Sequence, residues 1–433
     1  MLYELCRLPL RLLFMAFYRR INFSNYKKNF PKKDPVLVVT NHNTACAEQM
    51  LVATFQKRGV YFWARASVFP GGFADWLFKQ GHLIPVYRPQ EGFKNMYKNK
   101  EIFKSSQDLL LENKVLYIAP EGKCVRKKRL RTFKTGSARI ALGAAAETNF
   151  TKDIKVLPAG VNYTHHTNFR SDVMISFGQS ISMLDYKELY EENPQKAVRQ
   201  LTEDMKMGVR KEMIHIENPD DDELAEQLFT LSRSQEIDSI FPLFSTDRSQ
   251  LETEQNLAEM LNTMNPSEKE YLQKETKEYF EELDKEDLDD QAVAGQNKNN
   301  WFRTLGLLSF FPIFIMGYIA GWLPMNAARY LRKKNVKDLQ FWAPTAIVFA
   351  ALTWTIYSTA LIGIGAFFMG WSAILLAPTV ALGQYITLYY QETWKRWLVN
   401  YKYTTWKNQS PEEALQLEEK RGQLMHKLQE KVA

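Results

Sequence analysis

The residues best suited to chemistry in the first half of the sequence are His42 and Glu48. A histidine backed by a carboxylate is a general base, because the carboxylate orients the ring and stabilises the imidazolium while the other nitrogen takes a proton from an alcohol. Such assistance is worth roughly 10²–10⁴-fold in rate. His42 follows directly on the β-branched run Val36–Thr40, at a predicted strand end, where α/β proteins place their ligands. On its own, however, the pair is more typical of a structural hydrogen bond.

Three further apolar runs end in, or contain, residues that would shape a pocket. The run Gly81–Arg88 ends in a cation, and Ile118–Lys123 ends in a turn with Glu121 and Gly122. The run Val156–Tyr163 contains Pro158. Arg88 can bind a phosphate bidentately, and Lys123 can add a point charge. Taken alone, Arg88 fits a surface salt bridge equally well.

The elements that position these residues follow from hydrophobic periodicity. Short β-branched runs alternate with longer helical stretches from Pro35 to about Ser182, which predicts an α/β fold with a mixed sheet flanked by helices. The expected strands are Val36–Thr40, Val60–Trp63, Leu83–Tyr87, Val115–Ile118, Lys155–Leu157 with Val161–Tyr163, and Val173–Phe177. The expected helices are Ala45–Lys57, Gly72–Lys79, Phe93–Glu112 and Gly136–Ala146.

The length, net charge and cysteine content of the chain limit the class of protein. The chain has 433 residues and a net charge of +7, which favours an anionic membrane surface or nucleic acid as a partner. We expect membrane and no nucleic acid, because the basic residues sit beside apolar stretches. The three cysteines, Cys6, Cys46 and Cys124, are far apart and form no ligand pair. They indicate a reducing compartment and no zinc site.

The last third of the sequence predicts an integral membrane protein. Thr304–Ala328 has no charged residue and is long enough to cross the hydrocarbon core once, and Leu339–Gln391 is long enough to cross twice. Gly363, Gly365 and Gly370 mark where the second stretch could turn. A transporter is disfavoured because Leu339–Gln391 lacks ionisable residues.

The charges that flank the apolar stretches leave the orientation of the chain in the membrane open. Basic residues follow both apolar stretches, which places both flanks on the cytoplasmic side by the positive-inside rule. The catalytic part should share that side, because thioester donors are cytoplasmic. All three can do so only if Thr304–Ala328 re-enters the membrane, which its Pro312 and Pro324 allow.

Five regions result. Residues 1–30 form an amphipathic membrane-associating helix, with packing on the chain's own domain as the alternative, and 31–183 form the α/β domain. Residues 184–300 form a charged helical region and linker, whose acidic run Glu281–Asp290 fits a solvated helix face. Residues 301–398 form the transmembrane region, and 399–433 form a polar helical tail.

The four blocks, in this order and at these distances, resemble the lysophospholipid and glycerol-3-phosphate acyltransferase superfamily, the PlsC-like proteins. Its blocks are a histidine and an acid, an apolar strand ending in arginine, a Pro-Glu-Gly turn and an apolar Pro-containing strand. The matching residues here are His42 with Glu48, Gly81 with Arg88, Pro120-Glu121-Gly122 and Leu157-Pro158. The segments Lys134–Arg139, Asn162-Tyr163, Phe169–Ser171 and Phe177-Gly178 are similar to the bacterial and fungal branch that acylates glycerol-3-phosphate or dihydroxyacetone phosphate.

The resemblance implies direct acyl transfer from acyl-CoA or acyl-carrier protein to a hydroxyl of glycerol-3-phosphate or 1-acylglycerol-3-phosphate. His42 would be the base and Glu48 its partner, Arg88 and Lys123 would hold the acceptor phosphate, and Glu121 and Gly122 would shape the glycerol side. It implies no metal and no bound cofactor. This chain departs from the superfamily in having five residues, not four, between the histidine and the acid, and a Glu where Asp is usual.

Two alternatives remain. The acceptor could be another lysolipid or an amino-acid lipid, or the chain could be a non-catalytic membrane scaffold that binds lipid on the same fold. A covalent route through Cys46 is the weakest reading, because no nucleophile elbow is present in the sequence.

Overall fold

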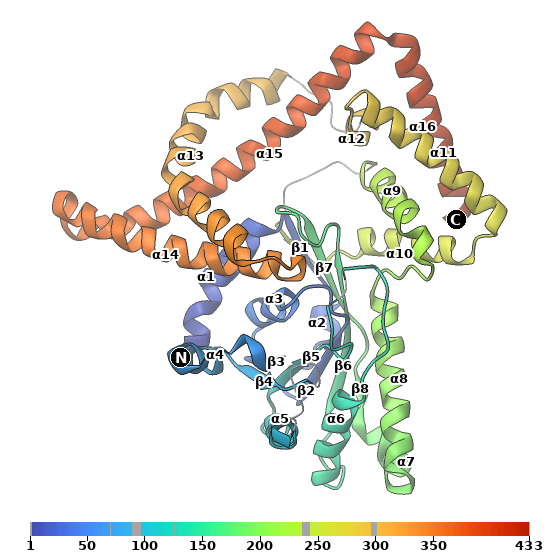
Figure 1. Ribbon diagram of the computed structural model, residues 1–433, viewed down its shortest axis with the longest axis vertical. Helices are drawn as coiled ribbons and strands as arrows, with labels where there is room; N and C mark the ends of the chain where they lie inside the picture. The colour runs from blue at the N-terminus through green and yellow to red at the C-terminus, as the bar shows by residue number, and fades with distance from the viewer. Residues whose placement is uncertain are drawn as a thin grey trace. The chain divides into compact units, whose positions relative to one another are not determined.

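The computed structural model describes residues 2–69, 71–88, 97–124, 126–235, 243–295 and 301–432 (Figure 1). The chain forms two compact units. The first contains Met1–Met213, Leu243–Arg248 and Asn335–Val348, and the second contains Ile214–Pro242, Ser249–Lys334 and Phe349–Ala433. Each unit is therefore assembled from segments that lie far apart in the sequence.

A mixed β-sheet forms the centre of the first unit. Within the described residues it has nine strands, in the order β4-β3-β5-β2-β6-β7-β1-β9, with β8 paired to β6. Strands β2, β3, β4 and β5 are parallel, and so is the first part of β6, whereas β6 and β7 are antiparallel. The strands are β1 (Arg20–Ser24), β2 (Val36–Thr40), β3 (Val60–Arg65), β4 (Leu83–Val86), β5 (Val115–Ile118), β6 (Lys155–Tyr163), β7 (Asp172–Phe177), β8 (Ile181–Ser182) and β9 (Phe244–Ser245).

Helices cover both faces of this sheet. The side chains of β2 alternate: Val36 and Val38 join one buried cluster, and Leu37 and Val39 join the other. The first cluster includes residues of α1 (Leu2–Phe17) and α3 (Ala47–Phe55), and the second includes residues of α5 (Asn99–Leu111), α6 (Gly136–Glu147) and α8 (Pro194–Glu212). The other helices of this unit are α2 (Tyr26–Asn29), α4 (Gly72–Gln80) and α7 (Lys187–Glu192). The predicted fold class is confirmed.

The predicted strands and helices between Pro35 and Ser182 are present, with two differences. The two runs in Lys155–Tyr163 form one continuous strand, β6. The beginning of the predicted helix Phe93–Glu112 lies outside the described residues, and α5 occupies Asn99–Leu111. Strands β1 and β9 were not predicted; β9 has only two residues, too few to show a period of two.

Pro158 has a packing function in β6. A Cβ atom added to Gly208 of α8 would lie 2.6 Å from the Pro158 ring. A Cβ atom on Gly160 would lie 2.7 Å from the Met213 nitrogen, just beyond α8. The two glycines therefore let α8 lie directly against the strand, close to the point where β2 ends.

Helix α1 packs on the chain's own domain and leaves part of its apolar surface exposed. Tyr3, Phe14 and Phe17 are buried in the core of the first unit. By contrast, Leu5, Leu8 and Leu12 of the same helix are 72%, 64% and 45% exposed. The helix thus packs on its own domain and still presents an apolar stripe.

The second unit is helical. Its polar helices are α9 (Asp222–Arg233), α10 (Ser249–Thr263), α11 (Pro266–Lys285), α12 (Asp290–Val293) and α16 (Pro411–Val432). Of the helices in the region 184–300, α9 belongs to the second unit, whereas α8 (Pro194–Glu212) belongs to the first. The end of the predicted linker, residues 296–300, lies outside the described residues.

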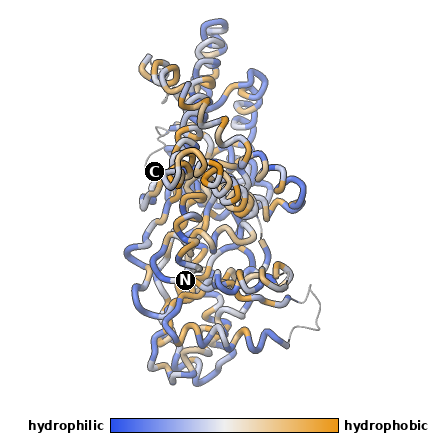
Figure 2. The backbone as a smooth tube through the Cα atoms, turned by 90° about the vertical axis from the view of Figure 1, so that its left-hand side faces the viewer, coloured by the Kyte–Doolittle hydropathy of each residue, from blue (hydrophilic) through white to orange (hydrophobic). Residues whose placement is uncertain are grey.

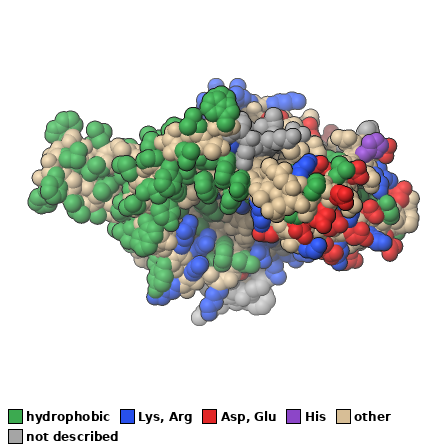
Figure 3. All heavy atoms as spheres, turned by 90° about the horizontal axis from the view of Figure 1, so that it is seen from above, with side chains coloured by type: hydrophobic (Ala, Val, Ile, Leu, Met, Phe, Trp, Pro, Cys, Tyr) green, Lys and Arg blue, Asp and Glu red, His purple; other side chains and the backbone are tan. Residues whose placement is uncertain are grey.

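Two helical stretches are long and apolar enough to cross a membrane, Trp301–Asn335 and Leu339–Gln409. The first is α13, and the second contains α14 (Trp342–Met369) and α15 (Leu376–Gln409). These helices carry long hydrophobic stretches in Figure 2, and Figure 3 shows hydrophobic side chains covering the arm that α14 and α15 form. Such helices indicate a membrane protein.

The predicted turn in the second apolar stretch is present at one of the three glycines. Gly370 has φ +59°, and the short 3₁₀ segment Gly370–Leu375 joins α14 to α15. Gly363 and Gly365 lie inside α14. Left-handed backbone at Gly370 costs little because glycine has no Cβ atom.

Candidate active site

The loop Asn41–Cys46 carries the proposed base and begins where β2 ends. Asn41 fastens the loop to β6: its side-chain nitrogen donates to the Val161 carbonyl at 2.8 Å, and its oxygen accepts from the Val161 nitrogen at 2.7 Å. The Asn43 side chain donates to the same carbonyl at 2.8 Å. These bonds hold the backbone on both sides of His42, so that its ring projects from a fixed point at the sheet edge.

Glu48 lies in the first turn of α3, fully buried, behind the His42 ring. Its Oε2 is 4.0 Å from His42 Nδ1, and that nitrogen has no hydrogen bond within the described residues. Its Oε1 accepts from the Asn43 nitrogen at 3.0 Å and from the Thr44 nitrogen, and Oε2 accepts from the Thr44 hydroxyl at 2.8 Å. The carboxylate therefore fixes the loop and faces the ring nitrogen that points away from the substrate side.

The Glu121–Gly122 turn, after β5, lies beside the same loop. Glu121 Oε1 accepts from the His42 backbone nitrogen at 3.2 Å. Gly122 has φ +66°, which only glycine adopts without strain, and a Cβ atom there would lie 2.9 Å from Lys134 Nζ. The turn thus contributes a carboxyl group to the site and brings the Lys134 amine close to its backbone.

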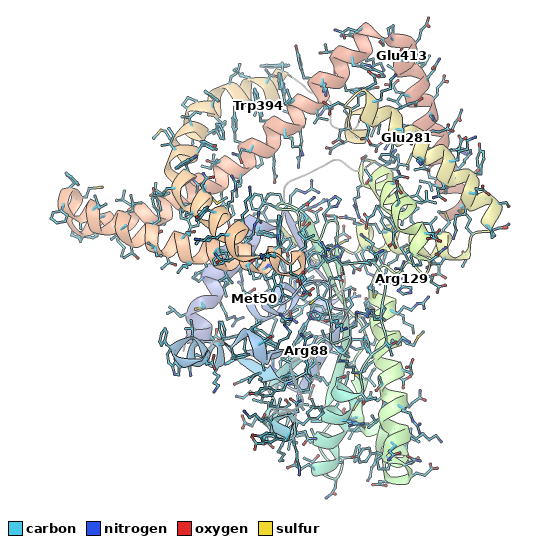
Figure 4. The ribbon with its side chains drawn as sticks, viewed as in Figure 1. Met50, Arg88, Arg129, Glu281, Trp394 and Glu413 are labelled. Atoms are coloured by element: carbon cyan, nitrogen blue, oxygen red, sulfur yellow. The ribbon has the colours of Figure 1, made fainter. Side chains whose placement is uncertain are left out.

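Arg88 follows β4 and reaches this turn. Its Nη1 donates to the Gly122 carbonyl at 2.9 Å, and Figure 4 shows it among the side chains of the first unit. Because β2, β4 and β5 are parallel in one sheet, their carboxyl ends share one edge, and the structure brings His42, Glu121–Gly122 and Arg88 together there. Lys123 lies next to Gly122 with an exposed side chain.

Cys124 lies beside the Nε2 nitrogen of the imidazole, opposite the nitrogen that faces Glu48. Its Sγ lies 3.2 Å from His42 Nε2 and 3.3 Å from the Thr44 carbonyl oxygen, to which the thiol can donate. Burial raises the pKa of the Cys124 thiol well above its ordinary range, so the group is a neutral hydrogen-bond donor at physiological pH. Cys124 was not predicted to belong to the site.

Burial shifts the pKa of the histidine and the pKa values of the two carboxyl groups in opposite directions. It lowers the pKa of His42 to about 4, helped by the nearby Arg88 charge. It raises the pKa of Glu48 to about 7 and that of Glu121 to about 8. The imidazole is therefore neutral at pH 7, as a proton acceptor must be.

A segment from the apolar third of the chain also contacts this loop. The Ala45 nitrogen donates to the Gln340 carbonyl at 3.0 Å. The guanidinium carbon of Arg65, at the end of β3, lies 5.0 Å from the centre of the Phe341 ring. We call Asn335–Val348 the interspan segment; Ala343 and Ile347 in it are buried in the core of the first unit.

Sequence reasoning missed Cys124, Arg65 and the interspan segment. Cys124 follows the Glu121–Gly122 turn by two residues, and this position was the one available signal. Gln340 and Phe341 gave no signal, because their contacts, with Ala45 and Arg65 respectively, join segments that lie far apart in the sequence. Within the described ranges, no three His, Cys, Asp or Glu side chains are grouped so that they could hold a metal ion.

Comparison with known proteins identifies the first unit. Residues 20–162 match the family described as Acyltransferase. Over 105 residues the chain is 35% identical to glycerol-3-phosphate O-acyltransferase 2 of Saccharomyces cerevisiae, covering 24% of this chain and only 14% of that relative's length. The crystal structure of the 1-acyl-sn-glycerophosphate (LPA) acyltransferase PlsC from Thermotoga maritima is similar with a TM-score of 0.33 and 18% identity, over 46% of this chain and 74% of that one.

The family match confirms the resemblance drawn from the four sequence blocks. It runs from β1 to β6 and includes His42, Glu48, Arg88 and the Glu121–Gly122 turn. Residues 20–162 of the chain therefore form a domain that matches the Acyltransferase family.

Proposed function

We propose that this protein is a membrane O-acyltransferase of glycerophospholipid synthesis. It transfers a fatty acyl group from acyl-CoA or acyl-carrier protein to a hydroxyl of glycerol-3-phosphate or 1-acylglycerol-3-phosphate. The observation that carries the proposal is the arrangement around His42: a buried carboxylate faces Nδ1, while Nε2 faces a thiol beside a basic turn. That arrangement provides a base with one nitrogen oriented and the other directed at a substrate.

In the proposed reaction His42 Nε2 takes the proton of the acceptor hydroxyl as its oxygen attacks the thioester carbonyl. The C–O bond forms, the C–S bond breaks, and the thiolate of the donor leaves and takes up a proton. Glu48 stabilises the imidazolium that forms between these two events. Because the acyl group passes directly to the acceptor, no covalent acyl-enzyme is required.

The acceptor phosphate would bind at the basic turn. Arg88 holds the Gly122 carbonyl with one nitrogen, and a guanidinium presents five donors in all. Lys123, adjacent in sequence and exposed, supplies a second positive charge. Glu121 and Gly122 would border the glycerol part of the acceptor, next to the His42 backbone.

The remaining assignments follow from the same proposal. The donor is a co-substrate, and the reaction needs neither a bound cofactor nor a metal. The catalytic unit would face the cytoplasm, where thioester donors are made. The expected division into residues 1–30, 31–183, 184–300, 301–398 and 399–433 is kept as the working description of the chain's regions.

The direct test is an assay of the purified full chain in liposomes. Labelled palmitoyl-CoA is supplied with glycerol-3-phosphate, 1-acylglycerol-3-phosphate, a lysophospholipid or an amino-acid lysolipid, and the product is identified. His42→Ala should lower kcat by roughly 10²–10⁴-fold. His426→Ala is the matched control, since His426 is 71% exposed on α16.

The outcomes separate the rival functions. Product with a lysophospholipid or an amino-acid lysolipid alone would change the acceptor and keep the chemistry. Equal activity in wild type and His42→Ala would reject His42 as the base. Binding of labelled lysolipid without any product, by folded wild-type protein, would favour the lipid-binding scaffold.

A further inference from the structure

Contacts inside the second unit join the two ends of its apolar region. Asp287, before α13, pairs with Lys402 near the end of α15. The Glu286 carboxylate accepts from the Trp406 indole at 3.1 Å, and Glu278 lies 3.6 Å from Lys420 of α16. Charged groups of this kind lie outside the hydrocarbon core. The chain before α13 and the chain after α15 are therefore on the same face of the membrane, and the number of crossings between them is even.

A second contact fixes the face on which α14 begins. The Ala45 nitrogen is hydrogen-bonded to the Gln340 carbonyl, so the interspan segment is on the face that carries the catalytic loop. Among the described residues between Ala45 and Gly295, no helix is long and apolar enough to cross a membrane. Both ends of α13 are consequently on the catalytic face, and α13 makes no net crossing.

The contacts of α13 with α15 begin at Thr304 and continue to Gly321. The Trp397 indole donates to Thr304 at 3.0 Å, and the Tyr390 hydroxyl donates to the Leu307 carbonyl at 3.0 Å. Further along, a Cβ atom on Gly317 would lie 2.8 Å from the Gly383 carbonyl. From Trp397 to Gly383 is 14 residues (397 minus 383), or about 21 Å of helix at 1.5 Å per residue. This is less than the hydrocarbon thickness of about 30 Å.

The α14–α15 hairpin is long enough to cross the hydrocarbon core and return. The first turn of α14 is held in the core of the first unit, and Phe349–Met369 in the second unit is 21 residues long. Twenty-one residues span about 31 Å, enough to cross once. The turn at Gly370 then lies on the opposite face, and α15 returns to the catalytic face.

The sequence of α13 suits a helix that enters and leaves by one face. Gly317 and Gly321 allow close approach to α15 on its inward course. Pro324 follows three residues later; proline removes a backbone hydrogen bond and bends a helix, and Figure 1 shows α13 as a curved ribbon. A basic cluster then begins, and such clusters mark the cytoplasmic face: Arg329, Arg332, Lys333, Lys334 and Lys337.

We propose that α13 is a re-entrant helix of the catalytic leaflet and that the α14–α15 hairpin is the transmembrane part of this region. The exposed apolar side chains of α13 then contact the acyl chains of that leaflet; they include Phe310, Phe311, Met316, Ile319, Trp322 and Leu323. This assignment does not depend on the acyltransferase activity.

The test is labelling of single cysteines with a membrane-impermeant maleimide in sealed vesicles of both orientations. Cys6, Cys46 and Cys124 are replaced by serine, and single cysteines are placed at Lys285, Asn335, Ser372 and Ser410. Lys285, Asn335 and Ser410 should be labelled from one side and Ser372 from the other. Ile356, in the middle of α14, should be labelled from neither side.

Labelling of Asn335 from the side opposite Lys285 would overturn the proposal, because α13 would then cross. A second measurement does not need the cysteine-free chain. Trypsin added to sealed vesicles with the catalytic face outward should cleave wild-type protein in the basic cluster Arg329–Lys334. Cleavage there only after the vesicles are opened would also overturn the proposal.

Discussion

At the scale of single residues, the chemistry depends on which groups are charged. Burial lowers the pKa of His42 to about 4 and raises that of Glu48 to about 7. The active form, a neutral imidazole with an ionised carboxylate, therefore forms as the pH rises through about 7. The same ionisation opposes folding. Because the pKa of Glu48 is raised in the folded state, the folded protein binds this proton more tightly than the unfolded chain does. The folded protein therefore loses stability as the pH rises toward 7.

Glu48→Gln should remove this charge while nearly preserving shape. We expect kcat to fall by about 10²-fold or more, because the neutral amide does not stabilise the imidazolium and can favour the wrong tautomer of His42. The rise in rate near pH 7 should disappear as well. The measurement is kcat against pH for wild type, Glu48→Gln and Glu48→Asp. An unchanged pH profile in Glu48→Gln would show that another group carries the titration.

Cys124 stands where the acceptor hydroxyl must approach His42 Nε2. The incoming hydroxyl displaces the thiol, which retains the Thr44 carbonyl as an acceptor at 3.3 Å. A serine hydroxyl is a stronger hydrogen-bond donor than a thiol, so in Cys124→Ser the acceptor must displace a stronger hydrogen bond to His42. We expect the KM for the acceptor to rise by about 2- to 5-fold, which corresponds to a fraction of the free energy of one hydrogen bond. Cys124→Ala should lower it, and the KM for acyl-CoA should not move.

The matched control for this series is Cys46→Ser, the same substitution in the loop that carries His42. Cys46 precedes α3 and its Sγ has no hydrogen bond to His42. Equal acceptor KM values for the Ala, Cys and Ser forms at position 124 would show that the thiol does not compete with substrate.

At the scale of elements, the site depends on close contact between β6 and α8. Gly160→Ala places a methyl group against the backbone at the end of α8. That backbone can make room only if α8 moves away from β6. We expect a loss of about 2–4 kcal/mol, within the range of overpacked cores and strained backbone. Gly143→Ala in α6 is the control: its Cβ atom meets only the flexible end of the Gln107 side chain. This variant should change stability by less than about 1 kcal/mol in either direction, since alanine favours the helix.

Thermal unfolding of both variants in detergent provides the measurement. Equal melting temperatures for Gly160→Ala and wild type would mean that α8 does not lie against β6 as described.

Much of this architecture could be predicted, for physical reasons that differ among elements. Val36–Thr40 and Val115–Ile118 are short β-branched runs between polar turns, and both are strands in the structure. Strand β1 was missed although Arg20–Ser24 alternates between polar and apolar residues, because this run was included in the predicted helical region of residues 1–30. The positions of His42, Arg88 and Glu121–Gly122 followed from the four-block resemblance, since parallel strands bring their carboxyl ends to one edge.

The unpredicted parts of the site share a different cause. Cysteine is commonly a small apolar residue in cores, so Cys124 carried no distinguishing pattern. Gln340 contributes a backbone carbonyl to the loop at Ala45, and backbone groups leave no trace in residue type. Contacts between distant segments of this kind become visible only in three dimensions.

At the scale of the whole molecule, the catalytic unit and the membrane helices are not separable pieces. A chain ending at residue 300 lacks Ala343 and Ile347, which are buried in the core of the first unit, and the Phe341 ring over Arg65. We expect this truncated chain to melt at a lower temperature than the full chain and to have no measurable acyl transfer. The melting temperature and the liposome assay measure both effects.

The informative control is a chain that ends at residue 348, after the interspan segment. It retains Gln340, Phe341, Ala343 and Ile347 and lacks the α14–α15 hairpin. It should melt at a higher temperature than the chain ending at residue 300. Equal melting temperatures for the two truncated chains would show that the interspan segment does not stabilise the first unit.

The interspan segment also sets an order of events during synthesis. The ribosome completes the sheet strands β1 to β8 by residue 182, but the core that surrounds them stays open until residues 343–347 are made. When these residues emerge from the ribosome, α13, which precedes them, has already emerged. The core of the first unit is therefore completed only after the first long apolar helix of the chain has been exposed.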